Sequence, residues 1–302
     1  MASIPETAFD VAILKYLVAG VVLVVCGLCV RTQHEQTKSI SNGSIYSINF
    51  FMAAICKSIN TYSWVVAVTI MPATIVATLE NLHVVWISLI LIVFLKVRVP
   101  GTWLTSSVIV LIGASLITGI GTESREGHLR WGLILGLNAG LFFALFNIFW
   151  VRGSLDDLPL WRRTTNMGAF LILSGLLICP FHAIYVFLFE PEAFVPFRSL
   201  PFEHLVVQSI NGLVGIGLTY FLINEAVNLM KNSGHLASVL LGLGISFAVL
   251  FTLLTEAIWF SETVTRAQWL GVLLFSTGFA AVRSHLLRQK EKLTTSPQAV
   301  SA

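Results

Sequence analysis

Charged residues are scarce in this sequence: they make up 11% of the 302 residues, less than half the share of an average soluble domain. Hydrophobic residues make up 56%, and the mean hydropathy is +0.85. This composition predicts an all-α polytopic membrane protein. The formal net charge of +3 is small, and no basic patch is interleaved with aromatic residues, so nucleic-acid binding is not expected.

Catalytic and metal-binding motifs are also missing. The seven histidines show no metal-ligand spacing, and neither a phosphate-cradling Gly-Lys motif nor a GxSxG motif occurs. We therefore expect no enzyme activity, no metal and no cofactor. The four cysteines fall in apolar runs, where we expect reduced thiols packed in the protein interior: Cys26, Cys29, Cys56 and Cys179.

Long apolar runs are abundant, and nine of them could cross a bilayer as helices. They are too long and too uniformly apolar to be the alternating strands of a barrel. The runs are 10–31, 45–70, 72–96, 102–121, 129–151, 165–189, 205–230, 235–260 and 267–284. They predict a bundle of about nine transmembrane helices.

The positive charges predict the orientation of this bundle. Twelve of the 18 Lys and Arg residues fall in loops on one side and four on the other, while Lys15 and Lys57 lie within runs. The positive-inside rule then places the C-terminus in the cytoplasm and the N-terminus outside. The short loops and the polar tail, 286–302, carry no retention signal that we recognise, so the plasma membrane is the expected location.

A weak internal repeat with an offset of 165 residues aligns Gly113 with Gly278. An odd number of crossings separates the two copies, so they have opposite orientations in the membrane. Inverted repeats are typical of secondary transporters, whose substrate site lies near the bilayer midplane between the halves. We therefore divide the chain into a first repeat of four helices, 1–125, and a second of five, 126–285.

The second copy carries a more specific pattern. An apolar run ends at a glutamate, the turn Glu262-Thr-Val-Thr follows, and the next run opens on Gln-x-x-Gly at 268–271 and ends with Gly278. This pattern resembles the closing helix pair of the drug/metabolite transporter superfamily, EamA type. Residues 129–153 resemble the helix that opens the second half in that family.

The resemblance covers roughly residues 40–285, and it implies ten helices in two inverted halves with both termini in the cytoplasm. Here nothing in the first half corresponds to the run 129–151, so one opening helix is missing, and its loss would produce an external N-terminus. A truncated gene model and a true nine-helix variant both fit. The first copy also lacks the acidic turn, because Val97 stands opposite Glu262.

Two charges lie inside apolar runs on either side of a predicted turn at Met71-Pro72. At 1.5 Å per helical residue, Lys57 lies about 21 Å and Glu80 about 12 Å from this turn. A charge at such a depth costs a few kcal/mol, so both should face a protein interior or a water-filled cavity. They predict either a pair that a substrate carboxylate or amine displaces during transport, or a structural ion pair between two helices.

Polar side chains near these charges complete the predicted substrate site. Asn60 lies one turn from the lysine, and Asn81 and His83, beside Glu80, could bind a ligand, although a lone histidine in a helix is often a core residue. Glu225 is the candidate acid of the second half and could carry a coupling proton. Asn228 flanks this glutamate and repeats the pattern of the first half. The remaining candidates could line the path or join helices by hydrogen bonds: Asn138, Asn147, Asn211 and Tyr220.

Small and aromatic residues predict how the helices pack and where they meet the membrane surface. A small-xxx-small stripe of Gly132, Gly136 and Gly140 indicates close helix packing. Tryptophans near run ends indicate interfacial anchors: Trp103, Trp131, Trp150, Trp161 and Trp269.

These features predict a secondary transporter that moves a small polar metabolite by alternating access. The sequence contains no ATPase motif, so a proton gradient or exchange would drive it. The alternative from another class is a membrane scaffold or sensor that keeps the fold without transport, and a membrane-embedded enzyme is the third. The expected partners are a small-molecule substrate and the lipid bilayer. The sequence does not decide whether the protein forms a homodimer.

Overall fold

The computed structural model describes residues 7–34, 48–70, 73–117, 129–153, 158–189, 202–230, 237–245 and 265–294. These residues are helical apart from short connections, and none of them forms a strand. Five described helices contain segments long and apolar enough to cross a membrane: Phe9–Arg31, Ile48–Ile70, Trp131–Gly153, Leu160–Ile184 and Leu205–Leu229. The prediction of a helical protein with several such helices is confirmed.

Five of the twelve described helical elements begin and end within five residues of a predicted run. Their bounds are α1 Thr7–His34, α2 Ile48–Ile70, α3 Ala73–Asn81, α4 His83–Val93, α5 Gly101–Ile117, α6 Leu129–Gly153, α7 Leu160–Phe189, α8 Phe202–Asn211, η2 Gly212–Leu218, α9 Thr219–Met230, α10 Ala237–Ile245 and α12 Arg266–Thr294. The rest of run 235–260, the turn at Met71-Pro72 and the turn at Glu262 lie outside the described residues.

Three predicted runs differ from the structure. Run 72–96 is two helices, because the N–H of Leu82 bonds the carbonyl of Leu79 at 3.2 Å in a tighter turn that separates α3 from α4. Run 205–230 contains the π-helix η2, whose sequence GLVGIGL is rich in glycine, the residue that adopts unusual backbone geometry at least cost. Run 267–284 continues as α12 to Thr294, into the predicted polar tail.

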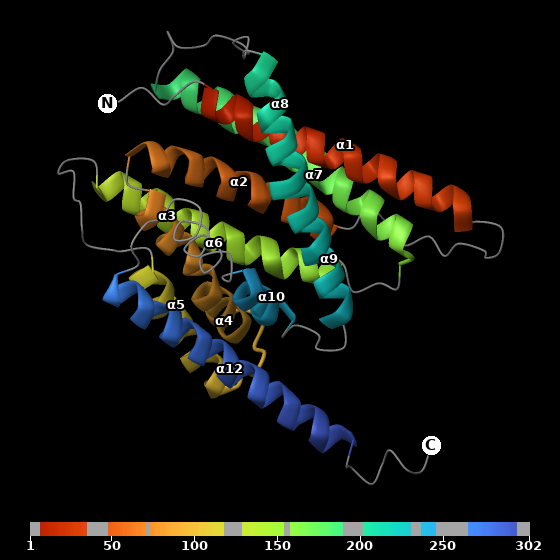
Figure 1. Ribbon diagram of the computed structural model, residues 1–302. Coiled ribbons are helices and arrows are strands. Elements are labelled where there is room, and N and C mark those ends of the chain that lie inside the picture. Colours follow the sequence, from red (N-terminus) through yellow and green to blue (C-terminus); the bar gives the residue numbers. More distant parts are fainter. Residues whose placement is uncertain are drawn as a thin grey trace.

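Pairs of helices distant in the sequence pack along their lengths: α1 against α7, α2 against α6, and α5 against α12 (Figure 1). Small residues allow these close approaches. A Cβ atom at Gly20 of α1 would lie 2.7 Å from the carbonyl oxygen of Gly168 on α7, so a larger residue would push the helices apart. Likewise, a Cβ atom at Gly140 would lie 2.6 Å from the carbonyl oxygen of Leu79, which confirms the close packing predicted for this stripe.

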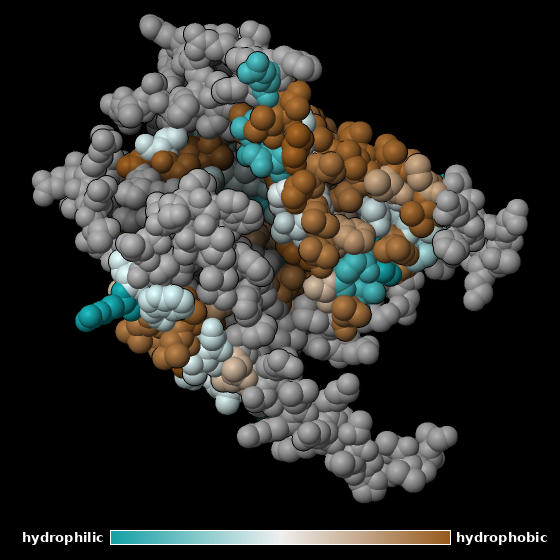
Figure 2. All heavy atoms as spheres, viewed as in Figure 1, coloured by the Kyte–Doolittle hydropathy of each residue, from teal (hydrophilic) through white to brown (hydrophobic). Residues whose placement is uncertain are grey.

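The described part of one face of the bundle is largely apolar (Figure 2). Figure 2 shows that hydrophobic residues dominate the described part of one face, as expected where lipid replaces water as the solvent. Trp131 and Trp269 are 64% and 57% exposed, whereas Trp103 and Trp150 are buried in the core and cannot be the predicted interfacial anchors. The prediction of buried cysteines is wrong for two of the four, because Cys26 and Cys29 are exposed on α1.

Candidate functional site

A cavity of about 360 Å³ lies among α1, α2, α3 and η2. Its polar wall consists of Lys15 and Tyr16 from α1, Lys57, Asn60 and Thr61 from α2, and Glu80 from α3. Its apolar wall consists of Val11, Ala12, Trp64, Val65, Val68 and Ile216. This volume is in the range of small-molecule binding sites, and the mixture of a few convergent polar groups with apolar walls is typical of such sites.

Helix α2 supplies the centre of this wall because its polar residues recur at helical spacing. Asn60 and Thr61 follow Lys57 by three and four residues, and Trp64 follows them by four and three; this spacing places all four on one face of a helix. The lysine is 7% exposed and the asparagine 1% exposed. The face that α2 turns toward the cavity therefore carries a buried charge and a buried amide.

An amide joins the two predicted charges. The ammonium Nζ of Lys57 donates to Oδ1 of Asn60 at 2.6 Å. Nδ2 of Asn60 donates to Oε1 of Glu80 at 2.9 Å and to the carbonyl oxygen of Ala139 on α6 at 2.9 Å. Among the described residues the charges thus form a relay, Lys57–Asn60–Glu80, instead of the direct ion pair that the sequence suggested.

Aromatic rings surround the ammonium of the relay. Nζ of Lys57 lies 4.5 Å from the ring centroid of Phe143, 5.7 Å from that of Tyr220 and 5.9 Å from that of Phe146. A cation over an aromatic face is attracted by the ring quadrupole, and the attraction is stronger when water is excluded. The rings of α6 and α9 therefore help to hold a charge at a depth where it would otherwise be costly.

The interrupted helices border this site. Glu80 lies near the end of α3, and Ile216 lies in η2; π-helical segments are frequent at functional sites. At the break after α3, Nδ1 of His83 lies 2.9 Å from the carbonyl oxygen of Glu80, and Nε2 lies 3.1 Å from that of Gly242 on α10. A neutral imidazole has one N–H and can donate to one of these two oxygens. His83 thus bridges backbone segments and is not part of the cavity wall.

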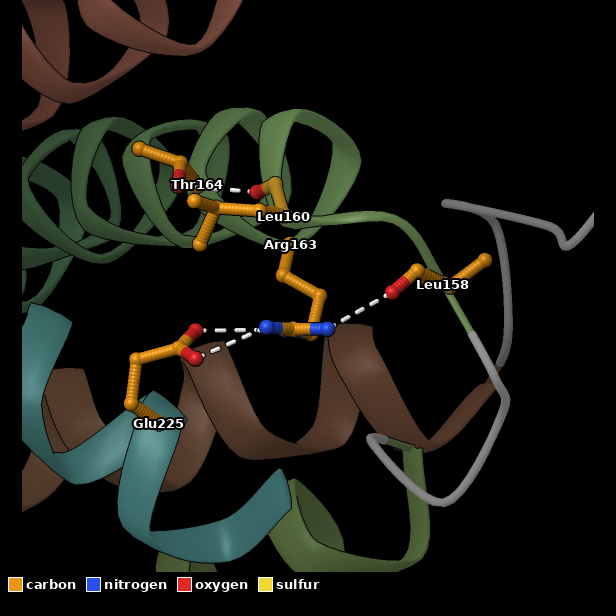
Figure 3. Close-up of polar contacts among 5 residues, drawn as sticks. All are labelled: Leu158, Leu160, Arg163, Thr164 and Glu225. Carbon is orange, nitrogen blue, oxygen red and sulfur yellow. Dashed lines mark hydrogen bonds and ion pairs between the residues drawn. The ribbon is translucent and has the colours of Figure 1, made fainter. Parts of the chain in front are cut away.

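Glu225, the predicted acid of the second half, is engaged elsewhere. Its carboxylate accepts two hydrogen bonds from Arg163, from Nε to Oε1 at 3.1 Å and from Nη2 to Oε2 at 2.7 Å (Figure 3). Nη1 of Arg163 donates to the carbonyl oxygen of Leu158 at 2.8 Å. This forked pair joins the start of α7 to α9, so the expectation of a cavity acid at Glu225 is corrected.

The other predicted residues do not line the cavity. Asn138 donates to Oγ of Ser63 at 2.8 Å and joins α6 to α2, and Asn81 donates to the carbonyl oxygen of Ala77 in its own helix at 2.9 Å. Asn147 is fully buried, and its amide finds no hydrogen-bond partner among the described residues. Asn211 is exposed and Asn228 is half-buried.

Sequence reasoning named Lys57, Asn60 and Glu80 and missed the other nine residues of the wall. Lys15 carried the same signal as Lys57, a charge within an apolar run, and Thr61 and Trp64 follow from helical spacing on α2. Tyr16 had no such signal; the structure places its hydroxyl 2.9 Å from Oγ1 of Thr61, which joins α1 to α2 across the cavity. The side chain of Lys15 has no hydrogen bond or ion pair among the described residues.

No family model and no curated protein matches this sequence. A solved structure described as "Crystal structure of protein" is similar to this chain with a TM-score of 0.65 and 15% sequence identity. The match covers 93% of this chain and 89% of that chain. At this identity the likeness shows that the two chains share a fold, which extends over nearly their whole lengths.

Proposed function

We propose that this protein is a secondary transporter of the drug/metabolite type, related to EamA transporters, that moves a small polar metabolite by alternating access. The observation that carries the proposal is the relay Lys57–Asn60–Glu80 on the wall of a cavity between helices that could span a membrane. Charges inside membrane helices are costly and most often mark a substrate or ion pathway. The protein acts as a carrier and not as an enzyme.

The relay differs from a purely structural contact because its hydrogen bonding is incomplete. An ammonium group has three donors, and Lys57 uses one of them, to Asn60. Glu80 accepts through Oε1, while its Oε2 has no hydrogen-bond partner among the described residues. These open positions at the cavity wall are available to a polar ligand.

Contacts between α5 and α12 support the two inverted repeats of the proposal. A Cβ atom at Gly113 would lie 2.7 Å from both the Gly271 oxygen and the Phe275 nitrogen, and one at Gly278 would lie 3.0 Å from the Ser106 oxygen and 2.9 Å from Cγ2 of Val110. An offset of 165 residues converts each contact into the other, as a two-fold axis between repeats would. The proposed transporter has nine helices, an external N-terminus and a cytoplasmic C-terminus, and lies in the plasma membrane.

The coupling acid of the proposed cycle is Glu80. Glu225 was the other candidate, but Arg163 occupies both of its oxygens. Glu80 retains an open oxygen beside the cavity, where a proton or an exchanged substrate could bind. In a cycle driven by a proton gradient or by exchange, the coupling proton or the exchanged substrate therefore binds at Glu80 on α3.

Ligand-dependent stability and exchange test this proposal. The purified protein is heated in mild detergent with a panel of metabolites at about pH 5.5 and 7.5; a ligand at a hundredfold excess over its Kd stabilises the folded state by about 2.7 kcal/mol. Each binder is then tested for counterflow in proteoliposomes, with Glu80→Gln as the comparison. We expect the parent protein to exchange at least one binder and Glu80→Gln to lose this exchange. Binding without any exchange would favour the scaffold or sensor.

A further inference from the structure

Among the described residues, the charges of the cavity wall do not balance. Two ammonium groups, those of Lys15 and Lys57, stand against one carboxylate, that of Glu80. The relay already joins Lys57 to Glu80 through Asn60. Lys15 is left as the one charge of this wall without a partner among the described residues.

Neighbouring titratable groups do not neutralise this excess. Asp10 lies on α1 outside the cavity wall. The ring nitrogens of His83 face two backbone carbonyls, and a protonated ring would only add positive charge. Glu225 is bound by Arg163. A net positive charge on a partly buried wall among apolar helices is unfavourable, so the occupied state gains most from an anion.

We infer that the ligand of this cavity is a small organic anion with one negative charge, a carboxylate attached to an apolar body; this inference rests on the proposed function. The carboxylate binds the ammonium of Lys15 and the open donors of Lys57. The body lies against Trp64, Val65 and Val68, which form a continuous apolar face on α2. A single negative charge makes the cavity neutral, whereas a zwitterion or a neutral molecule leaves the excess charge in place.

Four compounds that share a phenylethyl group test the charge of the ligand. Phenylpropionate is the anion, phenylalanine the zwitterion, phenethylamine the cation and phenylpropionamide the neutral analogue. Each is titrated into the full-length protein in detergent, and the shift of the thermal midpoint gives its affinity. We expect phenylpropionate to raise the midpoint and to bind at least about tenfold more tightly than the others, because a charge-assisted hydrogen bond contributes roughly 1.5–3 kcal/mol.

Two variants show where the anion binds. Lys15→Gln should weaken phenylpropionate binding by roughly tenfold to a hundredfold, and Lys15→Arg should retain it. Lys15 makes no hydrogen bond or ion pair among the described residues, so both variants should fold with an unchanged midpoint in the absence of ligand. Preference for another charge class, no binding by any of the four, or full binding by Lys15→Gln would overturn the inference.

Counterflow of the tightest binder separates this inference from the proposed function. Exchange of phenylalanine or phenethylamine would support the transporter proposal and contradict the inference that the ligand is an anion. Binding of phenylpropionate that depends on Lys15 but is never followed by exchange would support the anionic ligand and contradict transport.

Discussion

Two carboxylates in this protein meet basic residues in different ways. Glu225 binds Arg163 directly, through a planar fork in which both carboxylate oxygens and two guanidinium nitrogens are used. Glu80 meets Lys57 only through the amide of Asn60, and one of its oxygens stays open. The first arrangement is closed, whereas the second keeps positions at which a ligand can bind.

The two arrangements also differ in their surroundings. The side chains of Arg163 and Glu225 are 17% and 27% exposed where the start of α7 meets α9, and solvent there reduces the cost of a charge. Lys57 is 7% exposed and sits among aromatic rings next to a cavity. The forked pair joins two helices, and we propose that the relay is where a ligand binds.

The two arrangements should differ most in thermal stability when the acidic and basic residues of each are exchanged. The double variant Arg163→Glu with Glu225→Arg can rebuild a forked pair, so its midpoint should lie near that of the parent protein. Lys57→Glu with Glu80→Lys cannot rebuild the relay, because the bond from Nδ2 of Asn60 to the Ala139 carbonyl fixes the orientation of the amide. We expect this second exchange to cost about 3–5 kcal/mol. Thermal unfolding of both double variants and their four single variants measures the difference, and equal recovery would contradict it.

The linking amide gives the next largest effect. Asn60→Leu removes three hydrogen bonds, two of them to charged groups, and should cost about 3 kcal/mol and abolish ligand binding. Asn138→Leu is the matched control, since it removes one neutral bond, to Ser63, and should cost about 1 kcal/mol without affecting binding. Thermal midpoints and ligand titrations of both variants decide this, and equal losses would argue against a special role for Asn60.

The forked pair should affect stability and not binding. Glu225→Gln leaves Arg163 with a neutral acceptor and should cost about 1–2 kcal/mol, because the pair is partly exposed. The affinity for a ligand of the cavity should remain that of the parent protein. If Glu225→Gln weakened binding as strongly as Glu80→Gln, the two carboxylates would not have the separate roles assigned here.

The smallest effect is expected at the hydroxyl pair that joins α1 to α2 in the cavity wall. Tyr16→Phe removes the hydrogen bond to Thr61 and should cost about 0.5–1.5 kcal/mol. Thr61→Val should have a similar effect, and the double variant should cost little more than either single one. Additive losses in this double-mutant cycle would show that the two hydroxyls act independently.

Periodicity of apolar residues was sufficient to predict the helical class, because helices that face lipid need long apolar runs. It could not predict the break at Leu82 or the π-helix from Gly212, since both depend on local backbone bonding within runs that remain apolar throughout. It also did not separate Trp103, which packs in the core, from Trp131, which is exposed. Burial depends on contacts between segments that are distant in the chain, and these contacts cannot be derived from one sequence alone.

The site was predicted in part for a similar reason. Lys57 and Glu80 were found because a charge in an apolar run is unusual, and Asn60 followed from helical spacing. The same criterion applied equally to Glu225, but only the structure shows that Arg163 reaches it. Tyr16 lies on another helix, so no spacing rule could connect it to Thr61.

Accessibility of the cavity from both sides of the membrane tests the central claim most directly, and it requires no known substrate. Thr61→Cys, in a background without the four native cysteines, is treated with a membrane-impermeant maleimide from either side of oriented vesicles. Ala67→Cys, fully buried on the same helix, is the control that should remain unlabelled. Alternating access predicts that Thr61→Cys reacts from both sides, each at a measurable rate. Reaction from a single side, however long the exposure, would contradict the account.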